Sequence, residues 1–420
     1  MKTDRRKNNR GSVLISVLLI IVIVLAAGLI VALRYKSMQE EAAPVSAAAP
    51  APTEEPAATP VPPTPEPTMS PEEIKALEEA ERAEKEARKK EAAQYSFYQK
   101  LEKGYGANIL ILGDASITEE ESNGIDGVVD GPLFRALTEK LLEKYPVTKG
   151  GTISTTNYAC ESGNLLYDAI RVNAMPEEPS FDLAILNYGL NEQKNDVLSN
   201  FDALIYALKK KFPDCSIICT IEPCFHGLPS ELMTMSNASD TYGIPVINLF
   251  STFYNKGYEA YFDYFDRSQT YLSEKGMEEW VRLLCEIIDT NVENSTGKMG
   301  DISMSSPIAE EVAELCFIPA SDPRVSRKDD TSYTLDFKAK GLSYILHKEM
   351  IAKDDAKIVA DGMLYSFGKP AGIETPEGDY LTLIYGDLRC ENDFTITFTS
   401  KELADGLKGF YLIEKSEEKK

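Results

Sequence analysis

The chain has 420 residues, of which 43% are hydrophobic and 26% charged, and its formal net charge is -23. This length accommodates two folded domains together with non-globular segments, and the composition is that of a soluble globular protein. Nucleic acids and anionic membrane surfaces require a basic footprint. The acidic charge therefore excludes a nucleic-acid partner.

The N-terminal region carries a strong membrane signal. Residues 13–33 contain no charged side chain and are rich in Ile, Leu, Val and Ala, so as a helix they would span about 30 Å, one hydrocarbon core. Basic residues gather before this segment, at Lys2, Arg5, Arg6, Lys7 and Arg10, and thin out after it, at Arg34 and Lys36. The positive-inside rule predicts a cytoplasmic tail at 1–12, a transmembrane helix at 13–33 and an extracytoplasmic remainder. A cleaved signal peptide is the alternative, because small residues surround Ala47 to Ala49.

A tether and a helical stalk follow. Residues 34–69 are rich in Pro, Ala, Thr and Glu and lack the apolar surface needed to offset ordering entropy, which predicts a semi-extended linker. Ser70 then offers an N-cap and Pro71 a first helical residue, with a glutamate placed to complete a capping box. This predicts a charged helical stalk over 70–104 that ends at Gly104 and docks its aromatic end on the next domain.

From 105 to 290, short apolar runs alternate with helical patterns. The runs are 108–112, 152–158, 183–187, 216–221 and 245–249, and the helical patterns are 133–144, 197–211 and 273–289. Such alternation predicts an α/β domain with a doubly wound, flavodoxin-like parallel sheet covered on both faces. Ligands of such sheets bind beyond the carboxyl ends of the strands, so the loops after the strands are expected to carry the chemistry.

Four blocks occupy those loops in chain order. They are Gly113-Asp114-Ala115-Ser116-Ile117-Thr118, Asn157-Tyr158-Ala159-Cys160-Glu161-Ser162-Gly163-Asn164, Asn187-Tyr188-Gly189-Leu190-Asn191-Glu192, and Tyr271-Leu272-Ser273-Glu274-Lys275-Gly276-Met277. Their order and sequence resemble the four blocks of the SGNH (GDSL-like) hydrolases. The resemblance implies an SGNH-type fold at 105–290 and ester hydrolysis without a cofactor.

Ester hydrolysis needs a hydroxyl nucleophile, a base and donors for the oxyanion. The resemblance assigns the donors to the backbone of Gly163, the side chain of Asn191 and the backbone N–H at the nucleophile, and it places Asp114 in the same site. The alternative is that Asn191 is a cap or turn residue and Gly163 an ordinary loop glycine.

The nucleophile position departs from the family pattern. Ala115 directly follows Gly113 and Asp114, and the serine arrives one residue later as Ser116. A one-residue shift on a tight turn redirects the side chain. Either a local bulge aims Ser116 into the crevice, or the nucleophile is lost.

The usual acid/base pair is missing. Counting back from Gly276 places Tyr271 where the family has its His and Ser268 where it has its Asp; counting forward from Asp266 would place Gln269 at the His position. Neither alignment supplies an imidazole, so an unmodified triad is excluded.

Two histidines are present, His226 and His347. His226 follows the 216–221 run and so lies at the same sheet edge as the blocks, where it is a speculative base for Ser116. The alternatives are a loop histidine without a catalytic role, or a carboxylate base at Glu222 or Asp266 whose pKa burial would raise. His347 lies in the C-terminal region and is expected to be structural or exposed.

The seven cysteines are an odd number for an exported protein, so at least one is unpaired. Three of them and a histidine cluster at Cys215, Cys219, Cys224 and His226. Their spacing fits no standard zinc site, and no metal is expected.

Residues 306–416 form a predicted β-rich accessory domain. A short helical pattern at 308–316 precedes β-type runs at 332–337, 357–360, 363–367, 380–385 and 394–399. Asp361-Gly362 is a two-residue hairpin signal. These features predict a small β-sandwich, which either binds glycans, by analogy with modules on other hydrolases, or packs on the α/β domain.

The leading hypothesis is a membrane-anchored, extracytoplasmic ester hydrolase-like protein, acting on O-acetyl groups of a carbohydrate. The rival is an inactive pseudo-hydrolase that binds a cell-surface glycan or a protein. A structural envelope protein held by its stalk is a third hypothesis, which the retained oxyanion positions disfavour.

Overall fold

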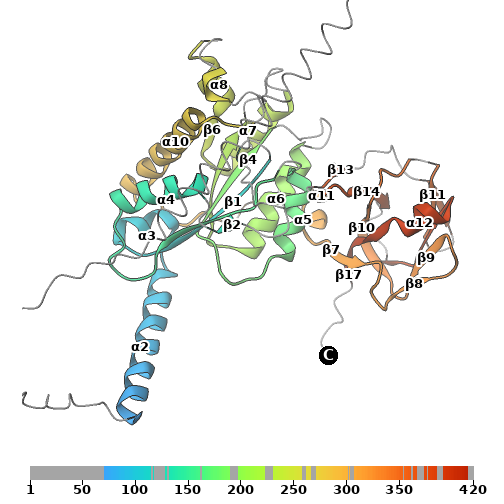
Figure 1. Cartoon of the computed structure of the whole chain (residues 1–420), viewed down its shortest axis with the longest axis horizontal. Coiled ribbons are helices and arrows are strands. Elements are labelled where there is room, and N and C mark those ends of the chain that lie inside the picture. Colours follow the sequence, from blue (N-terminus) through green and yellow to red (C-terminus); the bar gives the residue numbers. More distant parts are fainter. Residues whose placement is uncertain are drawn as a thin grey trace, which may run out of the picture. The chain divides into compact units, whose positions relative to one another are not determined.

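A computed structural model gives the fold of the chain beyond its N-terminal seventy residues (Figure 1). The described residues are 71–114, 117, 128–129, 132–160, 163–189, 197–222, 230–257, 262–265, 271–300, 302, 307–352, 354–360, 363–366, 373–375, 377–385 and 391–414. The predicted cytoplasmic tail, transmembrane helix and linker lie outside them. Among the helices within these ranges, none is long and apolar enough to span a bilayer.

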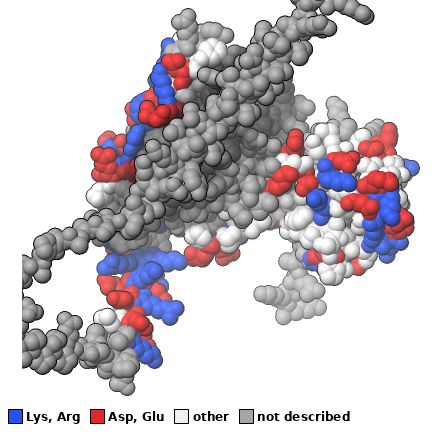
Figure 2. All heavy atoms as spheres, in the orientation of Figure 1, with Lys and Arg blue, Asp and Glu red and all other residues white. Residues whose placement is uncertain are grey.

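The stalk predicted as one helix is two. Helix α2 (Pro71–Ala92) is exposed from Lys75 to Glu91, with Lys and Arg interspersed among Glu (Figure 2). Helix α3 (Phe97–Lys103) starts afresh at Ser96, whose side chain accepts from the Gln99 N–H in a capping box, and it ends at Gly104 in the left-handed conformation with φ 74°. The predicted aromatic docking is confirmed, because Phe97 and its neighbours on α3 are buried. Burial of this short helix fixes its direction independently of α2.

The α/β domain contains the predicted parallel sheet. Its parallel strands are β1 (Ala107–Gly113), β3 (Ile153–Asn157), β4 (Leu183–Tyr188), β5 (Ser216–Ile221) and β6 (Val246–Asn248). They lie in the order β3-β1-β4-β5-β6, and a two-residue strand β2 (Val128–Val129) pairs antiparallel with β3 at the edge. The chain thus moves outward from β1 to β3 and returns to the other side of β1. This is the flavodoxin-like order, with its switch point beside β1.

Helices cover both faces of this sheet (Figure 1). One face packs α3, α4 (Pro132–Lys144), α8 (Leu249–Tyr254) and α10 (Glu274–Glu293) against side chains such as Ile109 and Ile111. The other face packs α5 (Leu165–Ala174), α6 (Val197–Lys211), α7 (Ser230–Tyr242) and α11 (Pro307–Ala313) against side chains such as Leu110 and Leu112. Alternate residues of β1 therefore serve opposite cores, as the pleat requires.

Several short elements of this domain were not predicted. They are β2, α5, α7, α8 and the 3-10 turn η2 (Phe262–Tyr264). Helix α5 is the important omission, because it begins directly after the second block: Asn164 caps it by accepting from the Tyr167 N–H. The ten residues of α5 follow the polar second block directly. No separate turn sequence therefore marks where the helix starts.

The C-terminal part is β-rich, as predicted, and contains two antiparallel sheets. The first has the order β13-β14-β10-β17-β7, with β15 also paired to β10: β7 (Cys316–Pro319), β10 (Ala339–His347), β13 (Ile373–Glu374), β14 (Tyr380–Tyr385), β15 (Glu391–Asn392) and β17 (Leu407–Glu414). The second has the order β12-β11-β16-β9-β8: β8 (Val325–Arg327), β9 (Ser332–Leu335), β11 (Ala356–Ala360), β12 (Met363–Ser366) and β16 (Phe394–Phe398). A short helix, α12 (Lys401–Asp405), precedes β17.

One apolar core joins these two sheets. It combines Ile345 and Phe410 of the first sheet with Ile358 and Ile396 of the second. The hairpin predicted at Asp361-Gly362 agrees with the register, because Ala360 pairs with Met363. The strands β10 and β17 were missed, although they form the centre of the first sheet.

The predicted helix 308–316 is shorter, because the chain passes into β7 at Cys316. Helix α11 packs on α6 of the α/β domain. Leu381 of β14 and Tyr411 of β17 belong to the same apolar cluster as α5 and α6. The β-rich part therefore packs directly on the α/β domain.

Trp280 of α10 is the single tryptophan and anchors one face of the sheet. It is fully buried, its ring lies edge-to-face with Phe134 at 5.6 Å, and its Nε1 has no hydrogen-bond partner among the described residues. Trp280→Ala should lower the free energy of unfolding by about 3–5 kcal/mol through cavity formation. Trp280→Phe should cost much less, because it keeps an aromatic ring and removes an unpaired buried N–H. Urea unfolding of residues 71–420, followed by circular dichroism, measures the free energy of unfolding of both variants. Equal losses of stability in Trp280→Ala and Trp280→Phe would contradict the prediction.

Candidate active site

Polar residues lie together at the carboxyl ends of β1, β3, β4 and β5. This row of strand ends is called the carboxyl edge of the sheet below, and the opposite row of strand ends the amino edge. Asp114 follows β1, Gly163 lies in the loop after β3, Asn187 and Tyr188 end β4, and Glu222 follows β5. Because the switch point lies beside β1, this edge is where the fold places a ligand crevice.

Several predicted site residues lie outside the described residues. They are Ala115, Ser116, Asn191, His226 and Ser268. Asp266 and Gln269, weighed for the base, lie outside them as well. The described members of the predicted site are Asp114, Gly163 and Tyr271.

Asp114 connects the ends of two neighbouring strands and is fully buried. Its Oδ2 accepts from the Gly189 N–H at 3.0 Å, and its own N–H donates to the Asn187 carbonyl at 3.0 Å. Both bonds fix the exit of β1 against the exit of β4. Asp114 therefore ties the end of β1 to the end of β4.

Gly163 is held against the end of β1. A Cβ added to Gly163 would lie 2.2 Å from the Gly113 carbonyl oxygen, a distance that no side chain tolerates. The loop glycine of the second block is thus required by packing. Its N–H donates to the Cys160 carbonyl at 2.9 Å, so this donor is already engaged in the turn. Stabilising an oxyanion would require that hydrogen bond to be shared or released.

A chain of buried polar groups runs along the edge. Thr220 Oγ1 donates to Asn187 Oδ1, and Asn187 Nδ2 donates to Glu222 Oε1. The Glu222 N–H donates to the Tyr188 carbonyl at 3.0 Å. Asn187, Thr220 and Glu222 are all fully buried. Glu222, one of the candidate bases, is therefore a carboxylate held in place by the amide of Asn187.

Helix α5 adds a buried ion pair to this chain. Asp168 pairs with Arg171 one turn later, and the Tyr188 hydroxyl donates to Asp168 Oδ2. Arg171 Nη2 also donates to the Tyr158 carbonyl at 2.9 Å, which holds the loop of the second block. We call Asp114, Asp168, Arg171, Asn187, Tyr188, Thr220 and Glu222 the edge network.

Burial and charge act in opposite directions on Asp168. Desolvation raises the pKa of its carboxyl group to about 6, against the favourable charge of Arg171 and the Tyr188 hydrogen bond, which lower it. Nearby Asp114 raises the pKa slightly further. Asp168 is thus ionised at neutral pH and protonates in mild acid. Burial also raises the pKa of the neighbouring Cys160 thiol to about 12, which makes this thiol a poor nucleophile.

Tyr271 stands at the family's histidine position, half-buried, just before α10. Ser273 caps α10 by accepting from the Gly276 N–H at 3.2 Å. A Cβ on Gly276 would lie 2.1 Å from the Tyr264 carbonyl oxygen, so this glycine too is required by a close backbone approach. The fourth block therefore contains a glycine that packing requires.

The β-rich domain reaches the edge of the crevice. The Tyr167 hydroxyl of α5 donates to Glu377 Oε1 at 2.9 Å, and Asn164 Nδ2 donates to the Glu374 carbonyl at 3.5 Å. Both partners lie beside β13, which places this part of the accessory domain next to the loop that carries Gly163. His347 contributes nothing to the site, because it is buried on β10 and its ring bonds Glu349 and Leu403.

The described residues contain no group of three or more His, Cys, Asp or Glu side chains arranged for a metal. Cys215 and Cys219 are fully buried on or beside β5, and burial raises the pKa of Cys219 to about 12. They pack as apolar groups.

Two solved structures match most of this chain. A two-domain esterase (CEX) active on acetylated mannans, co-crystallized with mannopentaose, aligns with a TM-score of 0.55 at 13% identity, over 76% of this chain and 94% of that chain. A second structure of a two-domain esterase (CEX) active on acetylated mannans aligns with a TM-score of 0.54 at 13% identity, over 76% and 95%. A lipase/acylhydrolase from Enterococcus faecalis aligns over 47% of this chain and all of that chain, at 15% identity and a TM-score of 0.34.

No protein-family model and no curated protein matches the sequence. The fold is SGNH hydrolase-like, as the four blocks predicted, and at this identity the two esterase structures support the fold alone. Their coverage extends through the β-rich domain as well as the α/β domain.

Sequence reasoning missed the α5 half of the edge network. Asp168 and Arg171 are charged residues three apart in the otherwise apolar 165–172 segment, a pattern that marks a buried ion pair on a covered helix. Asn187 had a comparable signal, as the polar residue closing an apolar strand. Neither the Asp168 and Arg171 spacing nor the polar Asn187 indicates a buried network until the surrounding residues are known to be buried.

Removing Arg171 should change how stability depends on pH. Arg171→Met deletes the main favourable charge beside Asp168, so the Asp168 pKa should rise above its present value of about 6. A carboxyl group with a raised folded pKa takes up a proton on folding, and its stabilising contribution is lost as pH rises through that pKa. The variant should be near wild type at about pH 5 and lose roughly 3–5 kcal/mol at about pH 8.

Trp280 fluorescence during urea unfolding of residues 71–420 measures this. Arg282→Met is the control, because Arg282 is an exposed arginine that also pairs with carboxylates, the half-buried Glu279 and the exposed Glu286. It should cost less than about 1 kcal/mol, with no trend across this pH range. If the loss in free energy of unfolding of Arg171→Met does not grow with pH, Arg171 is not the group that keeps Asp168 ionised.

Proposed function

We propose that this chain is a membrane-anchored, extracytoplasmic ester hydrolase whose substrate is an O-acetyl group on a carbohydrate. The observation that supports the proposal is the edge network at the carboxyl ends of the strands, which includes Glu222, a buried acidic side chain bonded by Asn187. The similar two-domain esterase acts on acetylated mannans, which supports an acetylated glycan as the substrate class.

In the proposed reaction Ser116 Oγ attacks the acetyl carbonyl carbon while a base takes its proton. Asn191 and the backbone at Gly163 and Ser116 stabilise the oxyanion, and the sugar hydroxyl leaves with the proton. Water then hydrolyses the acetyl-enzyme, releasing acetate and restoring the serine. The base is His226 or a carboxylate, with Glu222 favoured over Asp266 because Asn187 fixes its position.

An inactive glycan- or protein-binding protein is the second candidate. Two observations favour it: the Gly163 N–H is engaged with the Cys160 carbonyl, and a tyrosine stands at the family's histidine position. Such a protein would keep the crevice for capture of a ligand without turnover.

Acetate release separates the two. The full chain in a non-ionic detergent should release acetate from acetylated glucomannan and p-nitrophenol from p-nitrophenyl acetate. Ser116→Ala should reduce the rate by about 10³-fold or more, whereas Ser321→Ala, an exposed serine of the β-rich domain, should leave it unchanged. Equal rates in wild type and Ser116→Ala would sink the hydrolase proposal, and saturable binding of the glucomannan without turnover would support the second candidate.

The base is identified by two further variants in the same assay. Glu222→Gln keeps an oxygen acceptor for Asn187 Nδ2 but removes the carboxylate, and His226→Ala removes the imidazole. If one of the two variants stays folded and loses activity, the residue it replaces is the base.

The proposed topology is a single pass at 13–33 with the N-terminus in the cytoplasm. A protease added outside intact cells should cut within the 34–69 linker and release one fragment that contains both folded domains. Retention of the whole chain under conditions that cleave a control exported protein would contradict the anchor.

A further inference from the structure

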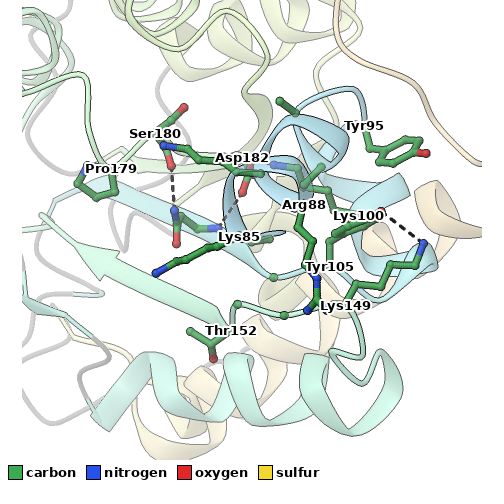
Figure 3. Close-up of a pocket in the computed structure, with 18 of the residues that line it drawn as sticks. Lys85, Arg88, Tyr95, Lys100, Tyr105, Lys149, Thr152, Pro179, Ser180 and Asp182 are labelled. Carbon is green, nitrogen blue, oxygen red and sulfur yellow. Dashed lines mark hydrogen bonds and ion pairs between the residues drawn. The ribbon is translucent and has the colours of Figure 1, made fainter. Parts of the chain in front are cut away.

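A second concave site lies at the opposite edge of the sheet from the crevice. A pocket of about 920 Å³ opens between the C-terminal half of α2 and the amino ends of β1 and β3 (Figure 3). Its size is within the range of sites for ligands of a few rings. The loops at 149–152 and 178–182 complete the wall.

Helix α2 is fixed as one wall of this pocket. Lys89 pairs with Glu178 at 3.0 Å, and the Ala93 carbonyl at the end of the helix accepts from Lys298 Nζ at 2.6 Å. The rings of Tyr95 and Tyr105 lie 5.6 Å apart between centroids, tilted by 31°. These contacts join α2 to the α/β domain. The pocket is therefore bounded by α2 on one side and by the amino ends of β1 and β3 on the other.

The lining has five acidic and five basic side chains. Of its five Lys and Arg side chains, three are paired: Arg88 with Glu84, Lys89 with Glu178, and Lys100 with Asp182. Lys85 and Lys149 form no ion pair among the described residues. Both are exposed, and Lys149 Nζ lies 4.6 Å from the centroid of the Tyr105 ring, a contact that leaves its charge uncompensated.

These cations are spread along the pocket. Lys85 and Lys149 lie toward opposite ends, with Arg88 between them (Figure 3). Arg88 Nη1 lies 3.3 Å from where a Gly150 Cβ would stand, so the guanidinium covers a stretch of loop backbone that has no side chains. Gly150 and Gly151 have φ of 93° and 87°, which keeps that backbone open to close approach. A compact anion would meet only one of the two unpaired lysines, whereas an extended ligand would meet both.

We propose that this pocket binds an extended acidic oligosaccharide through Lys85 and Lys149. The negative groups of the ligand meet these two lysines, and its hydroxyl groups meet the polar side chains of Asn108, Thr152 and Ser180 on the same wall. Uronate carboxylates and sugar phosphates both supply this chemistry. The site is separate from the crevice and does not depend on ester hydrolysis.

Calorimetric titration of the full chain in a non-ionic detergent tests this, with oligogalacturonate, a phosphorylated mannooligosaccharide and neutral maltotetraose as probes. At least one acidic probe should bind saturably, and Lys85→Gln/Lys149→Gln should raise its Kd by about tenfold or more. The control is Lys90→Gln/Lys140→Gln, which removes the same charge from exposed residues outside the pocket and should change Kd by less than about twofold.

A third variant should change the Kd of the acidic probe in the opposite direction. Glu81 lies on the lining one turn before Lys85, so Glu81→Gln should tighten binding of the acidic probe. The carboxylate and phosphate probes decide which anionic group is preferred. No saturable binding of either acidic probe, equal Kd for the two double variants, or equally tight binding of maltotetraose would overturn the proposal. Because no readout involves acetate release, a failure of the hydrolase proposal leaves this result unaffected.

Discussion

The polar groups buried at the carboxyl ends of β1, β4 and β5 must find hydrogen-bond partners inside the protein, because water does not reach them. The edge network meets this requirement. Asp114 bonds Gly189, Asn187 bridges Thr220 and Glu222, and Tyr188 bonds Asp168. Each bond joins neighbouring strands, or a strand and α5, at the edge where the loops of the blocks leave the sheet. The positions of those loops depend on it.

A parallel sheet also separates two kinds of surface. The parallel strands all start at one edge and end at the other, so the edge network lies at the carboxyl edge while α2 and α3 arrive at the amino edge. The edge network and the α2 pocket therefore lie at opposite ends of the same strands. The β-rich domain contacts the carboxyl side, through Glu374 and Glu377.

Local patterns predicted the elements that have long, regular signals. The run 216–221 is β5, the pattern 197–211 is α6 and the run 380–385 is β14, residue for residue. The failures were elements with short or interrupted signals. Helix α5 follows a polar block without a turn, and the predicted 70–104 helix breaks at Ser96 because α3 is buried by its aromatic residues while α2 is solvated.

The sequence by itself determined the α/β class and the order of the four blocks, because these depend on local periodicity and residue identity. Only the tertiary structure showed that Asp168 and Arg171 meet Tyr188, that the Gly163 N–H is engaged by Cys160, and that Lys85 and Lys149 border one pocket. Apart from Gly163 and Cys160, these residues are far apart in the chain or lie on an unpredicted helix. Their contacts are set by how helices pack on the sheet, which a pattern of apolar residues does not specify.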